Sequence, residues 1–183
     1  MGTTGIYRID LKNLFLSTTY NFDYLLDNDF FESVDGAEVR KGKLNVSLSV
    51  TRVSTFFEFD FQIRGEVTVI CDRCLDELEI PVETTNRLCV TFGEMFTEIS
   101  DEQIIVSAEE GFIDIDWYIY EFIALAIPLK HVHAIGDCNE VMASKLRELC
   151  VDVTDENDDT ASGNSRRPVD PRWDALRDLL EGN

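Results

Sequence analysis

The sequence predicts an α+β fold, in which an antiparallel β-sheet or partly open barrel is followed by helices. Alternating apolar and polar residues fill most of the first 92 positions. Such period-two patterning is typical of strands with one buried and one solvated face. After Gly93 the alternation gives way to apolar residues at helical spacing. The segments between the alternating runs are short, which favours antiparallel pairing.

The alternating pattern recurs in separate runs along the first half of the chain. These runs are residues 20–24, 44–50, 57–63, 67–71, 78–82 and 88–92. Gly42 and Gly65 lie at the boundaries of runs, where we expect turns or bulges. Residues 27–33 predict a short helical turn that carries Phe30 and Phe31 onto the core.

The second half predicts loops and helices. An acidic, weakly periodic stretch follows the strands, and we expect it to form a loop with a short strand at residues 104–106. A helix should come next, with Asp114 or Asp116 as its N-cap and Pro128 at its end. Its apolar residues on adjoining faces are Ile119, Phe122, Ile123 and Ala126. A second helix is predicted over residues 140–150.

The sequence also predicts a division of the chain into three parts. Residues 1–150 are expected to form a single α+β domain. Residues 151–169 read as an acidic flexible linker, because they contain too few apolar residues to order themselves. Residues 170–183 predict a C-terminal amphipathic helix, with Pro171 at its first helical position. Docking of this helix on its own domain and docking on a partner both stay open.

Charge is the strongest compositional feature. The chain has 36 acidic and 16 basic residues and a net charge of -20. Residues 93–164 alone contain 17 acidic and 3 basic residues. Phosphate backbones repel such a surface, so direct, generic nucleic-acid binding is not expected. A basic partner, such as a ribosomal protein or a cationic tail, fits this charge better. The alternative is that the acidity only keeps the protein soluble.

The location expected from the sequence is the cytoplasm. No apolar run approaches the roughly 18 residues of a membrane span, so no membrane association is predicted. Arg8 and Asp10 interrupt the first residues, which argues against the core of a signal peptide. The five cysteines are an odd number without a dense framework, and this favours a reducing compartment.

The sharpest chemical feature is the pair Cys71 and Cys74. Two thiols at this spacing lie across a tight turn and reach one tetrahedral metal ion. The pair follows a strand and precedes more strand-like sequence, as in a metal-binding knuckle on a hairpin. A thioredoxin-type redox pair would instead begin a helix, and Pro81 argues against one here. A pair of free, packed thiols is the alternative.

A tetrahedral site needs two more ligands. The sequence offers His131, His133, Cys138 and Cys150 as candidates. Cys89 lies within a strand run and is better explained as a core residue. A loop after Pro128 can supply one histidine and one cysteine. The expected site, with zinc as the metal, consists of Cys71, Cys74, His133 and Cys138.

Three separated motifs also carry a resemblance to a known family. They are ICDRCL at residues 70–75, IPL at 127–129 and DPRWDAL at 170–176. In this order they resemble the bacterial YceD family, the large ribosomal RNA subunit accumulation proteins, over residues 20–180. Many members carry several cysteines between the second and third motifs. This chain has only Cys138 and Cys150 there, so His133 would have to replace a thiolate.

The resemblance implies a non-enzymatic factor that supports large-subunit ribosomal RNA accumulation and ribosome assembly. Together with the charge, it favours binding to a basic ribosomal protein or a pre-ribosomal particle. The alternative is a metal-dependent RNA-processing enzyme, for which Asp114 with Asp116, or Glu109 with Glu110, could hold Mg²⁺. The chain lacks a Gly-rich phosphate loop, a Gly-x-Ser-x-Gly elbow and a His-Glu-x-x-His helix, so catalysis is not expected.

Overall fold

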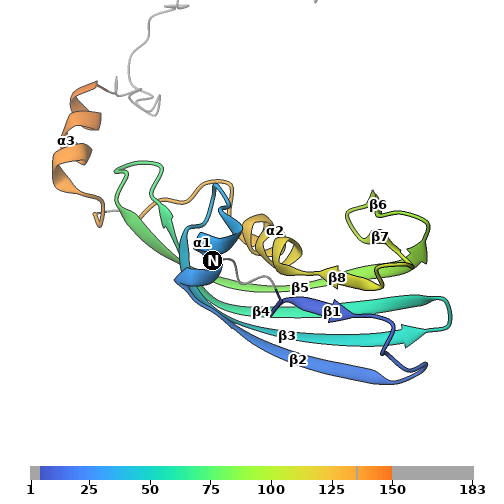
Figure 1. Ribbon diagram of the computed structural model, residues 1–183. Coiled ribbons are helices and arrows are strands. Elements are labelled where there is room, and N and C mark those ends of the chain that lie inside the picture. Colours follow the sequence, from blue (N-terminus) through green and yellow to red (C-terminus); the bar gives the residue numbers. More distant parts are fainter. Residues whose placement is uncertain (1–4, 135, 150–183) are drawn as a thin grey trace, which may run out of the picture. The chain divides into compact units, whose positions relative to one another are not determined.

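The computed structural model describes residues 5–134 and 136–149, and its main element is a six-stranded sheet. The strand order is β2-β3-β4-β5-β7-β6 (Figure 1). The strands are β2 (Thr19–Leu26), β3 (Lys41–Val53), β4 (Phe56–Ile70), β5 (Glu77–Gly93), β6 (Thr97–Ser100) and β7 (Gln103–Ser107). All neighbours are antiparallel except β5 and β7, which are parallel. The α+β prediction is confirmed, and the sheet is open rather than closed into a barrel.

A second, two-stranded sheet pairs β1 (Arg8–Asp10) with β8 (Phe112–Asp114). The sequence did not predict either strand, because three residues are too few to show a period. The β6–β7 hairpin is also larger than the single short strand expected in this region. The helices are α1 (Asn28–Val34), α2 (Asp116–Ala126) and α3 (Glu140–Leu149).

Gly42 and Gly65 lie inside strands, so the prediction of turns or bulges at these positions is wrong. Gly65 pairs with Leu44 on one side and Val82 on the other, and β4 continues through it. Its φ is 155°, and an added Cβ would collide with the carbonyl oxygen of Lys43. Glycine is therefore needed for close strand approach, not for chain reversal. The buried residues of β4 keep one parity on both sides of it: Phe57, Phe59, Phe61, Ile63, Val67 and Val69.

The core lies between one face of the large sheet and the elements that cover it. Helix α2 lies over this face (Figure 1), and the rings of Phe122 and Phe61 meet edge to face with centroids 5.2 Å apart. Helix α1 carries Phe30 and Phe31 into the same core, as predicted, and Asp27 is its N-cap. The Tyr120 hydroxyl accepts hydrogen bonds from two backbone N–H groups in the segment between α1 and β3. The covering layer is thus fixed by packing and by hydrogen bonds.

The start of α2 differs from the prediction and its end agrees with it. Neither Asp114 nor Asp116 is the N-cap, because Ile115 holds that position without a side-chain hydrogen bond. Asp114 belongs to β8, and Asp116 lies in the first turn, where its carboxylate accepts from the N–H of Trp117 at 2.9 Å. The helix ends directly before Pro128, because proline cannot continue a helix. Helix α3 agrees closely with the helix predicted over residues 140–150.

Several predictions fall outside the described residues. These are Cys150, the linker over 151–169 and the C-terminal helix over 170–183, and the predicted division of the chain stays a prediction. Among the described helices, none has the length and apolar character needed to span a bilayer.

Candidate metal centre

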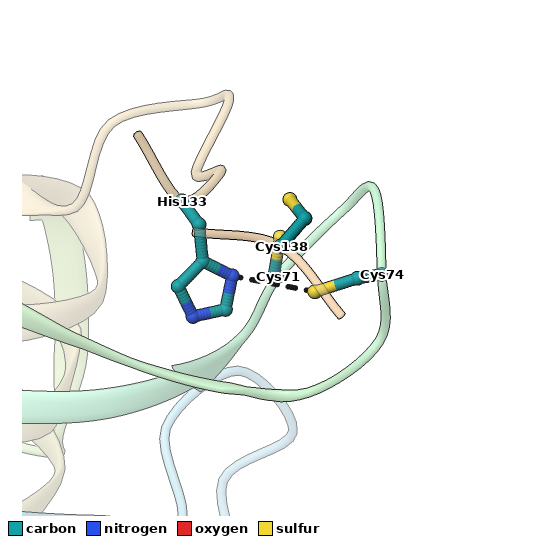
Figure 2. A group of neighbouring side chains, drawn as sticks. All are labelled: Cys71, Cys74, His133 and Cys138. Atoms are coloured by element: carbon teal, nitrogen blue, oxygen red, sulfur yellow. Dashed lines mark hydrogen bonds between the residues drawn. The ribbon is translucent and has the colours of Figure 1, made fainter. Parts of the chain in front are cut away.

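Cys71 and Cys74 lie on the turn that joins β4 to β5. Cys71 follows the last residue of β4, and its N–H donates to the carbonyl of Asp76 at 2.9 Å. The N–H of Leu75 donates back to the carbonyl of Cys71 at 2.9 Å, with Leu75 in the left-handed conformation at a φ of 65°. These bonds close the turn and hold both thiols near one point (Figure 2). The predicted turn between two strands, which we call the knuckle, is therefore present.

The segment after α2 folds back onto this turn through Asp72 and His131. The N–H of Asp72 donates to the carbonyl of His131 at 2.9 Å, and the N–H of His131 donates to a carboxylate oxygen of Asp72 at 2.8 Å. The His131 ring lies 3.2 Å from the carbonyl oxygen of Pro128 and 3.5 Å from the other Asp72 oxygen. His131 was a candidate ligand in the sequence, but its contacts make it a residue that positions the loop.

His133 and Cys138 complete a four-residue cluster with the two knuckle cysteines. The four ligand atoms all lie within 4.8 Å of one another. Nδ1 of His133 is 3.3 Å from the sulfur of Cys74 (Figure 2). Nε2 of the same ring is 3.2 Å from the carbonyl oxygen of Glu77. A carbonyl that accepts from Nε2–H leaves Nδ1 facing the sulfurs, which is how second-shell groups orient metal-binding histidines. Sequence reasoning did not identify Glu77, because a backbone carbonyl leaves no residue-type signal.

The three thiols of the cluster are buried. Exposed fractions are 0 % for Cys71, 2 % for Cys74 and 8 % for Cys138, and all three are free. Leu78, Val132 and Met142 pack around them. Cys89 lies in β5 as expected, but its placement in the core is a wrong prediction. It is half-buried and lies between the core residues Leu88 and Val90, so its side chain points to the opposite face of the sheet.

The cluster favours one thiolate at Cys71. Burial on its own raises the pKa of Cys71, but hydrogen bonds from the backbone N–H groups of Cys74, His133 and Arg73 outweigh it and lower the pKa to about 5. The hydrogen bond to Cys71 raises the pKa of His133. Burial, followed by the neighbouring thiols of Cys74 and Cys71, raises the pKa of Cys138. A metal cation that displaces the thiol protons of Cys74 and Cys138 would therefore find Cys71 already negatively charged.

The donor set fits zinc. Three sulfurs and one imidazole nitrogen are a common structural zinc set, and they leave no ligand position for water or substrate. Metal–sulfur bonds of about 2.3 Å place the sulfurs of a tetrahedral site about 3.8 Å apart. The four ligand atoms lie within 4.8 Å of one another, so they need to move only a little closer to bind one ion. Within residues 5–134 and 136–149, this is the only group of three or more histidine, cysteine or acidic residues with such geometry.

Two of the four carboxylates considered for Mg²⁺ have other partners. Both oxygens of Asp114 accept hydrogen bonds from the Arg8 guanidinium at 2.8 Å. Asp116 is engaged at the start of α2, as described above. Neither Glu109 nor Glu110 joins a cluster of possible metal ligands in the described part of the chain. Within the described residues, none of these four carboxylates belongs to a group with the geometry of a metal site.

Comparison with known proteins gives one result. A family model described as "Large ribosomal RNA subunit accumulation protein YceD" matches residues 59–180, which is more than half of the chain. The matched range includes all four residues of the cluster. No curated protein and no solved structure matches the chain significantly.

Proposed function

Because the chain belongs to the YceD family, we propose that it is a non-enzymatic factor that supports accumulation of large-subunit ribosomal RNA. It does so during ribosome assembly, by binding a basic ribosomal protein or a pre-ribosomal particle. The family match is the observation that carries this proposal, since the family's description names ribosomal RNA accumulation.

The charge supports the mode of action. With 36 acidic and 16 basic residues, the chain attracts basic proteins and repels bare RNA. A newly made ribosomal protein is rich in lysine and arginine because it must neutralise RNA phosphates. An acidic factor that binds such a protein, alone or on a particle, accelerates association and suppresses wrong contacts.

The second part of the proposal is a structural zinc ion held by Cys71, Cys74, His133 and Cys138. The burial of the three thiols and the closed donor set support a structural role. When bound, the ion joins the knuckle between β4 and β5 to the segment that follows α2. Metal binding would then contribute to folding stability, because the unfolded chain does not hold the four ligands together.

The decisive experiment is affinity purification of the full chain from its native cells at low salt, followed by mass spectrometry and RNA analysis. We expect ribosomal proteins of the large subunit, and we expect release as the salt concentration rises. Depletion of the protein should lower large-subunit RNA relative to small-subunit RNA. Recovery of no ribosomal material, with an unchanged RNA ratio after depletion, contradicts the proposal.

The enzyme alternative is tested with the purified protein and precursor ribosomal RNA in the presence of Mg²⁺ or Zn²⁺. We expect no cleavage. Cleavage that disappears in Asp114→Asn or Cys71→Ser would identify an RNA-processing enzyme and overturn the non-enzymatic role.

A further inference from the structure

A hollow of about 340 Å³ lies between the β6–β7 hairpin, β8 and the first turn of α2, and none of the four cluster residues lines it. Its aromatic lining includes Phe96 and Trp117, and each of these side chains is 53 % exposed. Both are large aromatic side chains with about half of their surface exposed, although Trp117 also packs on Tyr120 with ring centroids 5.7 Å apart. They are the side chains that most often anchor a binding partner.

The lining of this hollow carries negative charge. Glu98, Glu110, Asp114 and Asp116 contribute carboxylates, and no lysine or arginine belongs to the lining among the described residues. The Tyr118 hydroxyl donates to Glu98 at 2.9 Å, which holds that carboxylate at the hollow. Burial, together with this carboxylate, raises the pKa of Tyr118, so its hydroxyl stays protonated. Aromatic faces beside carboxylates suit an organic cation better than an apolar ligand or an anion.

The chain itself shows how one wall of the hollow binds a guanidinium group. The Arg8 guanidinium carbon lies 4.0 Å from the ring centroid of Phe112, while two of its nitrogens donate to the two oxygens of Asp114 at 2.8 Å each. Both Phe112 and Asp114 belong to the lining. An aromatic face and a bidentate carboxylate are the two elements by which arginine is recognised. Trp117 with Glu110 and Asp116 offers similar elements. Both carboxylates interact with Arg8 through space, but within the described residues neither forms an ion pair with a lysine or an arginine.

We infer that this hollow is a docking site for an arginine side chain of the basic partner, with Trp117 as its aromatic wall. The inference rests on the proposed function and adds the recognition element. Charge complementarity identifies the occupant, since carboxylates repel phosphate and attract a cation. Arginine is favoured over lysine because its planar, weakly hydrated head stacks on aromatic rings and forks to carboxylates.

The test uses the full chain and two synthetic octapeptides, one alternating arginine with glycine and one alternating lysine with glycine. Titration calorimetry should show tighter binding of the arginine peptide, with affinity that falls as salt rises. Trp117→Ala should weaken that binding by about tenfold, while Trp117→Phe should bind nearly as the parent does. Glu110→Gln should weaken it by about threefold. Two matched controls should leave it unchanged: Glu109→Gln next to the hollow, and Leu125→Ala on the exposed face of α2.

Three outcomes overturn the inference. Equal binding of the two peptides contradicts the preference for arginine. Equal affinity of the parent and Trp117→Ala for the arginine peptide contradicts binding in the hollow. In the third outcome, the double variant Arg166→Ala, Arg167→Ala binds the arginine peptide more tightly than the parent does. That result would assign the hollow to the chain's own C-terminal segment. The proposed function is tested separately by recovery of ribosomal material. If the parent and Trp117→Ala recover equal amounts of ribosomal material, the proposed function is supported and the docking site is contradicted. If the parent recovers none, the proposed function itself is contradicted.

Discussion

The sulfur of Cys74 lies 3.3 Å from Nδ1 of His133, although 59 positions of sequence separate the two residues. The other nitrogen of the same ring faces the carbonyl oxygen of Glu77 at the start of β5. One imidazole therefore bridges the thiol turn and the sheet. This relationship gives the loop after α2 a fixed place on the β4–β5 turn, and it motivates the first predictions.

The protein purified without chelators should contain about one equivalent of zinc. X-ray absorption should give bonds of about 2.3 Å to sulfur and about 2.0–2.1 Å to nitrogen. A chelator should lower the melting temperature, because the ion binds the folded state only. Cys71→Ser, Cys74→Ser and Cys138→Ser should each lose most of the metal.

Cys89→Ser is the matched control for these cysteine variants, because Cys89 lies outside the cluster on the other face of β5. It should keep the full zinc content and lose at most about 1 kcal/mol of stability. Zinc far below one equivalent in the parent, together with an unchanged melting temperature of Cys71→Ser, would contradict the site.

The two histidines should behave differently. His133→Ala should lose the metal, because no other imidazole faces the sulfurs among the described residues. His131→Ala should keep it and show only a lower melting temperature, since the His131 ring contacts Asp72 and Pro128. Metal content and melting temperature, measured on both variants, decide this. Loss of zinc in His131→Ala with retention in His133→Ala would reverse the assignment.

The metal-free protein should contain a thiolate at neutral pH. The pKa of Cys71 is lowered from 9.0 to about 5, so the thiolate absorbance of the apoprotein should persist as the pH falls and disappear near pH 5. Because the folded-state pKa is the lower one, the thiolate's contribution to stability is complete above pH 9.0 and is lost as the pH falls through about 5. Cys71→Ser should lack this absorbance. A thiolate signal that appears only near pH 9 would contradict the prediction.

Gly65→Ala should destabilise the fold strongly. Its φ of 155° disfavours a side chain, and the new Cβ would lie 2.6 Å from the Cα of Leu44 in the paired strand. We expect a loss of more than about 2 kcal/mol in urea unfolding, because backbone atoms cannot move aside. Gly136→Ala is the comparison, since Gly136 has a φ of 102° and open space around it, and it should cost about 1 kcal/mol. Equal costs would mean that strand contact plays no part.

The sequence by itself determined the features that depend on near neighbours. Alternation located the long strands, and Asp27 and Pro128 marked one end each of α1 and α2. The apolar residues keep the same alternation on both sides of Gly65. The sequence therefore already indicated one long strand at the position where a turn was expected. The spacing of Cys71 and Cys74 was enough to identify the knuckle.

Only the tertiary structure decided which distant segments meet. Arg8 pairs with Asp114 across 106 positions, and this ion pair accompanies the small sheet that had no sequence signal. The sequence already favoured His133 over His131, but only the fold shows that hydrogen bonds between Asp72 and the returning loop accompany the placement of His133 beside the thiols. Periodicity reports the faces of one element, whereas these contacts depend on the path of the whole chain. Residue type and spacing therefore identified the candidate ligands, and the fold shows that these four residues lie close together.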